Sequence, residues 1–343
     1  MVHLDPKFDL GAIEKSFSDG LLFELQRALR STLRGELFAL VSREPTVRDD
    51  LDRWARLTEN SIVEVSEEPA GTRYVIRNGP APPSESPPLG ERLWLYSNFD
   101  CNLACDYCCV RSSPKTARRA LPLETILRIS SEAPALGVRE IFVTGGEPLL
   151  LDEIAQILTA CARAAPTTVL TNGIPLAGRR LRELADLDRR RTIFQISIDS
   201  PTPERHDAHR GPGSWERAMR GVRAARAEGF RVRLAATVED DVQARELIEF
   251  FDRERVLPED RVIRPIARRG LAETGVAVVR ADLLPEITIT AEGVYWHPVG
   301  ADDRDLFVTS DILPLARAFD AVRQSFEREH ALVTRLLSTF HCA

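Results

Sequence analysis

The sequence predicts an α/β protein with a parallel sheet, preceded by a small α/β unit and followed by a short hairpin and helix. Two observations predict it: apolar runs alternate with amphipathic stretches from residue 92 onward, and a proline-rich segment separates this region from the N-terminal part. Prolines prevent helix and sheet pairing and favour an extended spacer. The predicted domains are residues 1–79, a linker at 80–91, a core at 92–280 and an extension at 281–343.

The N-terminal unit is predicted to be a βαβαββ sandwich. Its expected elements, in order, are a strand near 8–13, a helix at 19–34, a strand at 37–41, a helix at 47–57 and strands at 62–66 and 73–77.

The core is predicted to be built from βαβ units. The expected strands are residues 93–99, 140–144, 168–171, 193–198, 232–238 and 262–266. The helical stretches between them include residues 123–136, 151–164, 214–228 and 244–255. Parallel α/β architectures bind ligands at the carboxyl ends of their strands, so a site is expected there.

Composition excludes several classes. The chain has 343 residues, 43% hydrophobic and 29% charged, and no window approaches the roughly 18 consecutive apolar residues of a membrane span. The net charge of −6 argues against nucleic acid as a partner. Six cysteines, three of them close-set, do not form a disulfide framework, and a cytoplasmic location is expected.

The most informative motif is a CxxxCxxC set directly after the first core strand, at Cys101, Cys105 and Cys108. Three thiolates at this spacing can hold three irons of a [4Fe-4S] cluster and leave the fourth iron open to a ligand. A structural zinc site is the alternative, but zinc takes four ligands and the chain has no CxxC partner pair. Cys109 is expected to be a bystander, and Cys161 a small buried hydrophobe.

Two further motifs accompany the cysteines: Tyr107 precedes the third cysteine, and Gly145-Gly146-Glu147-Pro148 follows one βα unit later. With them, the chain resembles the radical S-adenosylmethionine (SAM) superfamily. The resemblance implies a partial (β/α)6 TIM-like barrel and two cofactors, a [4Fe-4S] cluster and SAM. It further implies reductive cleavage of SAM to a 5′-deoxyadenosyl radical, with an electron donor such as flavodoxin or ferredoxin.

The same resemblance implies which residues contact SAM. The Gly-Gly-Glu-Pro loop would receive the SAM ammonium group, Ser197 and Asp199 would face the ribose, and Arg210, in a His-Asp-x-x-Arg-Gly stretch, would bind the carboxylate. The full set of expected cofactor-binding residues is Tyr107, Gly145, Gly146, Glu147, Pro148, Asn172, Ser197, Asp199 and Arg210. His206 and His209 are expected to support the loop around Arg210.

The N-terminal unit resembles the TusA/SirA sulfur-carrier family through Gly20-Leu-Leu-Phe, Leu33-Arg-Gly-Glu-Leu and Asp49-Asp-Leu-Asp-Arg-Trp. Leu22 and Phe23 occupy the positions of that family's Cys-Pro pair. Without the thiol, a docking or recognition role is expected in place of sulfur relay.

The extension is predicted to form a hairpin at 286–298 and a helix at 313–337, and it resembles the SPASM and twitch extensions that hold auxiliary clusters. His297 stands where those carry a cysteine, and Cys342 is the one cysteine that follows. Two ligands cannot enclose a cluster, so a structural remnant is expected, with a metal site at His297 and Cys342 as the alternative.

The expected function is modification of a peptide or a small metabolite by hydrogen abstraction. One alternative is a sulfur-related reaction coupled to the TusA-like unit, and another is a non-catalytic iron-sulfur or zinc-binding interaction protein.

Overall fold

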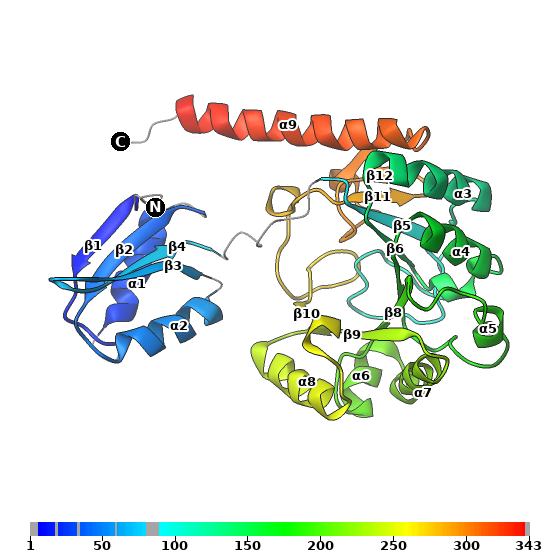
Figure 1. Cartoon of the computed structure of the whole chain (residues 1–343), viewed down its shortest axis with the longest axis horizontal. Coiled ribbons are helices and arrows are strands. Elements are labelled where there is room, and N and C mark those ends of the chain that lie inside the picture. The colour runs from blue at the N-terminus through cyan, green and yellow to red at the C-terminus, as the bar shows by residue number, and fades with distance from the viewer. Residues whose placement is uncertain (1–5, 18–19, 33–34, 59, 80–88, 340–343) are drawn as a thin grey trace. The chain divides into compact units, whose positions relative to one another are not determined.

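The computed structural model describes residues 6–17, 20–32, 35–58, 60–79 and 89–339 (Figure 1). The chain divides into two compact units, Met1–Pro88 and Leu89–Ala343. Most of the predicted linker, and also Cys342, lie outside the described residues.

The first unit is a four-stranded sheet with two helices. In chain order its elements are β1 (Phe8–Ala12), α1 (Leu21–Ser31), β2 (Leu37–Ser42), α2 (Val47–Leu57), β3 (Ser61–Glu68) and β4 (Gly71–Arg77). The strand order is β1-β2-β4-β3, with β1 and β2 parallel and the other pairs antiparallel. Leu21, Leu25 and Ala28 form one buried stripe of α1, whereas Leu22 and Phe23 are exposed.

The described part of the second unit contains one sheet of nine strands that is mainly parallel, which confirms the predicted α/β class. Six parallel strands extend from one edge of this sheet: β5 (Arg92–Asn98), β6 (Glu140–Gly145), β7 (Thr167–Thr171), β8 (Thr192–Ser197), β9 (Arg231–Val238) and β10 (Arg261–Pro265). Their order in the sheet follows their order in the chain, as repeated βαβ units require, and is consistent with a partial barrel.

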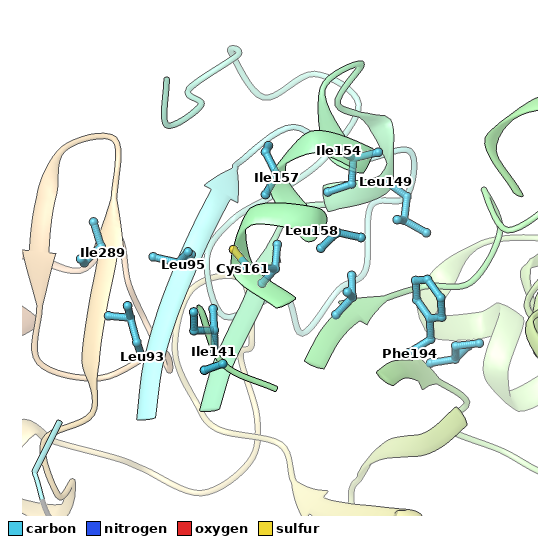
Figure 2. Close-up of a cluster of buried hydrophobic side chains, with 14 of the residues drawn as sticks. Leu93, Leu95, Ile141, Leu149, Ile154, Ile157, Leu158, Cys161, Phe194 and Ile289 are labelled. Atoms are coloured by element: carbon cyan, nitrogen blue, oxygen red, sulfur yellow. The ribbon is translucent and has the colours of Figure 1, made fainter. Parts of the chain in front are cut away.

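Helices occupy the connections between these strands. They are α3 (Leu123–Glu132), α4 (Ile154–Ala164), α5 (Gly178–Glu183), α6 (Pro203–Arg210), α7 (Ser214–Ala227) and α8 (Asp241–Arg253). Of these, α5 and α6 were not among the helical stretches expected from the sequence. Figure 2 shows how α4 packs: Ile154, Ile157, Leu158 and Cys161 lie at helical spacing and are buried against strand residues such as Ile141.

The C-terminal segment extends the same sheet. Strand β11 (Ile287–Thr290) pairs parallel with β5, and β12 (Gly293–Tyr295) and β13 (Phe307–Thr309) follow in antiparallel order. The last helix is α9 (Leu315–Thr339). Among the described residues, no helix combines the length and apolarity needed to cross a bilayer.

Candidate functional site

The three predicted cysteines lie in the loop after β5 and line one cavity of about 480 Å³. Cys101, Cys105 and Cys108 are half-buried free thiols. The backbone N–H of Leu103 donates to Cys101 Sγ at 3.4 Å, and that of Ser112 donates to Cys108 Sγ at 3.3 Å. The loop thus presents sulfur atoms to the cavity and stabilises two of them with backbone donors.

The electrostatics of this loop favour neutral thiols when nothing is bound. Burial, reinforced by the charge of Glu147, raises the pKa of Cys101 to about 12. Burial likewise raises the pKa of Cys105 to about 11, although the Arg210 cation opposes the shift. A positively charged metal centre would therefore displace protons as it binds.

The thiols are not arranged around a single ion. Two thiolates on one zinc ion, each about 2.3 Å from it, lie only about 3.8 Å apart. Within the part of the chain that the structure describes, no three His, Cys, Asp or Glu side chains converge closely enough to hold one metal ion.

Gly145 and Gly146 line the same cavity with their backbone, but the need for glycine comes from another neighbour. A Cβ at Gly145 would lie 2.2 Å from the carbonyl oxygen of Asn98, and one at Gly146 would lie 2.2 Å from that of Asp100. The sequence argument had the glycines admitting a ligand. In the structure, they admit the strand end that precedes the cysteines, and so fix the two loops together.

The Glu147 side chain makes its hydrogen bonds within the protein. Its carboxylate is fully buried and accepts hydrogen bonds from Thr171 Oγ1 (2.8 Å), the Asn172 N–H (2.8 Å) and the Leu149 N–H (3.1 Å). Burial raises its pKa to about 7. Neither Glu147 nor Pro148 lines the cavity. Glu147 links two strand ends, and its predicted contact with the SAM amine stays a prediction.

Asp199 and Arg210, predicted as separate SAM contacts, are each other's partners. Both are buried, and Arg210 Nε and Nη2 donate to the Asp199 carboxylate, the latter at 3.3 Å. Asp199 also accepts from the Tyr107 hydroxyl and, at 2.9 Å, from the Thr237 N–H. Four donors therefore surround the Asp199 carboxylate, and its contact with the ribose hydroxyls stays a prediction. Arg210 lines the cavity and retains Nη1 for a ligand.

Asn172 and Ser197 also line the cavity, at the ends of β7 and β8. Asn172 Nδ2 donates to Asn102 Oδ1 at 2.7 Å and lies 4.0 Å from Cys101 Sγ. Asn172 Oδ1 accepts from the Ile174 N–H at 3.0 Å, the turn contact that its Asn-Gly pair suggests. Asn172 therefore joins a turn to the cysteine loop.

The two histidines near Arg210 make structural contacts. His206 Nδ1 accepts from the Asp199 N–H at 3.2 Å, and burial lowers its pKa to about 4, so the ring is neutral. His209 Nδ1 lies 2.9 Å from the Asp106 carboxylate.

A smaller pocket of about 230 Å³ adjoins the cavity. The two share Tyr107 and Thr237 in their walls, and the smaller one adds Asp199, Gln243 and Ile266. An extended ligand could occupy both.

Comparison with known proteins decides the family of this region. Residues 96–252 match the model of the Radical SAM superfamily. Residues 96–252 are a radical SAM domain. Members of the Radical SAM superfamily are enzymes that use a [4Fe-4S] cluster and SAM.

Relatives of the radical SAM domain include two GTP 3′,8-cyclases. That of Yersinia pestis is 33% identical over 159 residues, which cover 44% of this chain and 47% of the relative. That of Pseudomonas entomophila is 35% identical over 166 residues, which cover 45% and 48%. The chain spans about half the length of the curated relatives it matches.

Among solved structures, native anSMEcpe with bound AdoMet and Kp18Cys peptide is similar in fold, with a TM-score of 0.53 and 11% identity over 68% of this chain and 82% of that one.

The cavity wall includes residues beyond the radical SAM domain that the sequence motifs did not reveal. They are Arg264, Pro265 and Ala267, at and after the end of β10, and residues 297–299, after β12. Cys109 lines the cavity as well, and its role as a bystander to the cluster stays a prediction. The backbone turns at the close-set cysteines, so Cys109 also borders the cavity.

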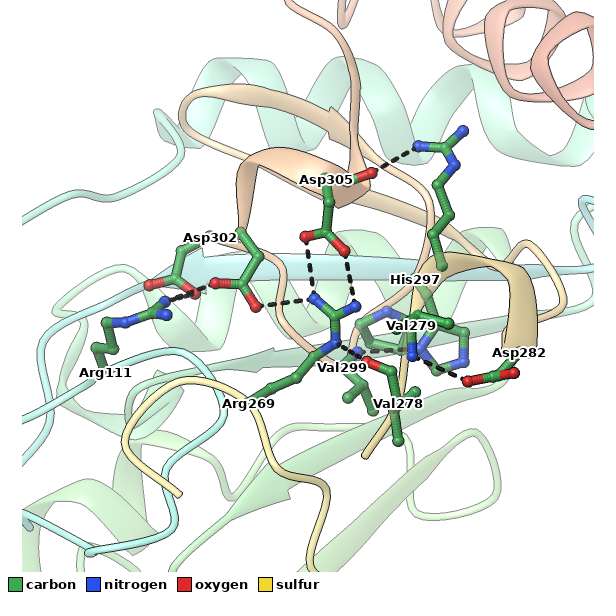
Figure 3. Close-up of polar contacts among 12 residues, drawn as sticks. Arg111, Arg269, Val278, Val279, Asp282, His297, Val299, Asp302 and Asp305 are labelled. Atoms are coloured by element: carbon green, nitrogen blue, oxygen red, sulfur yellow. Dashed lines mark hydrogen bonds and ion pairs between the residues drawn. The ribbon is translucent and has the colours of Figure 1, made fainter. Parts of the chain in front are cut away.

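Ion pairs link these later segments to the cysteine loop (Figure 3). Asp303 is shared: Arg111 Nη1 lies 2.8 Å from its Oδ1, and Arg269 Nη1 lies 3.0 Å from its Oδ2. Arg111 also pairs with Asp302 at 3.0 Å, and Arg269 with Asp305 at 2.8 Å. In the sequence, the acidic run Asp302-Asp303-Arg304-Asp305 could have indicated these ion pairs. Its partners Arg111 and Arg269 lie in distant segments, so the sequence does not identify them.

Proposed function

We propose that this enzyme binds a [4Fe-4S] cluster through Cys101, Cys105 and Cys108 and cleaves SAM reductively. The observation that carries the proposal is the shared cavity: the three thiols of one loop face the same space as the Gly145-Gly146 backbone and Arg210. Once bound and reduced, the two cofactors supply a 5′-deoxyadenosyl radical that removes a hydrogen atom from a substrate.

Arg210 is the proposed anchor of the SAM carboxylate. Its pairing with Asp199 uses Nε and one Nη2 hydrogen and fixes the plane of the guanidinium. The fixed plane holds Nη1 ready for a second carboxylate, which lowers the entropy lost on binding. We assign Asp199 as the residue that positions Arg210.

The other SAM groups fit the remaining walls. Backbone oxygens around Gly145 and Gly146 would accept from the ammonium group, and Asn172 and Ser197 offer further polar contacts at strand ends. The adenosyl part would extend past Tyr107 and Thr237 into the smaller pocket. In this placement, SAM runs across the carboxyl ends of the parallel strands.

The proposed substrate is a peptide or a small metabolite, and the proposed electron donor is a small redox protein such as flavodoxin or ferredoxin. The similarity in fold to a structure with a bound peptide supports the peptide alternative. The N-terminal unit, TusA/SirA-like in its pattern, would serve recognition, and its exposed Leu22 and Phe23 offer apolar surface for this. The segment from β11 to α9 would be a SPASM-like remnant that covers the cavity and holds no auxiliary cluster.

A second candidate function is cyclisation of a nucleotide, which the GTP 3′,8-cyclase relatives favour. A sulfur-related reaction has less support, since Leu22 and Phe23 stand where a sulfur carrier needs a thiol.

The test is anaerobic reconstitution of the full chain with iron and sulfide, followed by SAM and dithionite. The proposal predicts 5′-deoxyadenosine, detected by chromatography, in the absence of any substrate. Intact SAM in a preparation that holds its iron would contradict it. Adding GTP to the same reaction tests the second candidate, because a substrate should accelerate SAM consumption and yield a cyclised nucleotide.

A further inference from the structure

The segments after the radical SAM domain add two charged side chains and one imidazole to the cavity wall: Arg264 at the end of β10, Glu286 before β11 and His297 after β12. They come from three segments that follow the radical SAM domain. Since SAM would be held by the loops after β5, β6 and β8, these three side chains are available for a substrate.

Two of the charges in the wall are already compensated. Glu286 accepts from Trp94 Nε1, and Arg92 Nη1 lies 3.6 Å from its carboxylate. Arg210 is paired with Asp199. Arg264 differs, since its side chain makes no hydrogen bond or ion pair with any residue in the described ranges, and it is exposed. The wall therefore has one unpaired cation.

Arg264 is part of the cavity wall and acts electrostatically on its neighbours there. It helps to lower the pKa of His297, and it also acts on Cys109 and Tyr96, which line the same wall. Arg264 and these three residues all line the same cavity.

His297 presents a hydrogen-bond donor to the same space. Its Nδ1 accepts from the Val299 N–H at 3.1 Å, so in the neutral ring the proton is on Nε2. Burial, with help from the Arg269 and Arg264 cations, lowers its pKa to about 4, so the ring is neutral at pH 7. Tyr96 holds this segment in place, because its hydroxyl donates to the Pro298 carbonyl at 2.6 Å.

We propose that Arg264 and the Nε2–H of His297 form a subsite for one carboxylate group of the substrate. A guanidinium fork matches a carboxylate with two parallel hydrogen bonds, and a neutral N–H adds a third donor without a second charge. A triphosphate would place several negative charges against a single unpaired cation, so charge balance favours a carboxylate. The inference rests on the proposed function, since the substrate must share the cavity with SAM.

Arginine footprinting with phenylglyoxal tests the subsite at residue resolution. The reconstituted protein is treated with SAM present and no reductant, and the modification of each arginine is followed by peptide mass spectrometry. The probes are N-acetyl-alanyl-alanine, its C-terminal amide and inorganic triphosphate. We expect the free carboxylate to slow modification of Arg264 at least threefold and the amide to have no effect. Arg268 is the internal reference, because it is also exposed but is not part of the cavity wall.

Calorimetric titration of the same dipeptide into two variants gives an independent measurement. R264Q should bind it at least tenfold more weakly than wild type, and R268Q should bind it equally well. Equal protection by the carboxylate and the amide, no protection by any probe, or unchanged affinity in R264Q would each overturn the subsite. Stronger protection by triphosphate would show a phosphate site instead. No reductant is used, so a failure of SAM cleavage would refute the proposed function without affecting this result.

Discussion

Gly270 lies directly against the backbone of Cys108. The next residue, Leu271, donates its N–H to the Cys108 carbonyl at 2.9 Å, and a Cβ at Gly270 would lie 2.2 Å from that oxygen. Gly270 also has a φ of +65°, which side chains rarely adopt. The segment after β10 therefore packs on the cysteine loop at a distance that only glycine allows.

The first prediction concerns this contact. Gly270→Ala should displace the cysteine loop and lower the iron retained after reconstitution and desalting, measured as iron per chain. Gly137→Ala is the matched control: its φ is +83° but no atom lies within 4 Å of the added Cβ. Backbone strain should lower the free energy of unfolding of both variants by about 1 kcal/mol. Only Gly270→Ala should retain less iron than wild type. Equal iron in both would show that the contact does not position the cysteines.

A second prediction follows from the buried pair of Asp199 and Arg210. Asp199→Asn leaves a buried guanidinium without its counter-charge, so the free energy of unfolding should fall on the order of 3 kcal/mol. Asp320→Asn breaks an exposed pair with Arg323 and should cost at most about 1 kcal/mol. Urea unfolding of the metal-free protein under reducing conditions measures both. If the two variants lost the same stability, Asp199 would not be the partner that holds Arg210.

The buried His297 side chain predicts that the free energy of unfolding depends on pH. Its folded pKa of about 4 lies below the unfolded value of 6.5, so the folded state resists protonation. The contribution is fully present above pH 6.5 and is lost as the pH falls toward 4. Relative to His297→Asn, wild type should therefore lose stability on the order of 3 kcal/mol across this window. His206 titrates similarly but is common to both proteins, so it cancels in the difference. A difference independent of pH would show that His297 is not buried as described.

The N-terminal unit gives the fourth prediction. Deleting residues 1–80 should leave uncoupled SAM cleavage largely intact, because the proposed cofactor contacts lie in the second unit. Turnover of the true substrate should fall, because the deleted unit would supply recognition. The readouts are 5′-deoxyadenosine without substrate and product with it. Equal product formation after the deletion would remove the recognition role.

The sequence was sufficient to predict the parallel sheet. It was also sufficient to predict that the cysteines and the Gly-Gly-Glu-Pro loop lie at one edge of that sheet. Apolar runs of strand length, separated by amphipathic helices, leave few topologies, and the motifs follow directly after strands. The place of each motif directly after a strand therefore predicted that the motif lies at the carboxyl edge of the sheet.

The roles of individual side chains could not be predicted in the same way. Asp199 and Arg210 are 11 residues apart, and only the turn into α6 brings them together. Glu147 was expected to face a ligand. In the structure its carboxylate accepts from the nearby Leu149 N–H and from two donors at the end of β7 that no local pattern reveals. Arg264, Arg269 and Asp303 lie outside the familiar motifs, and their positions depend on how the last segments fold over the strands.

Iron and sulfide counts on two reconstituted proteins test the central claim most directly: wild type and the variant with Cys101, Cys105 and Cys108 all replaced by Ala. The account predicts about four irons and four sulfides per chain in wild type, from a single [4Fe-4S] cluster, and none in the variant. About four irons in the variant would contradict the assignment of the ligands. A count near eight in wild type would contradict the single cluster.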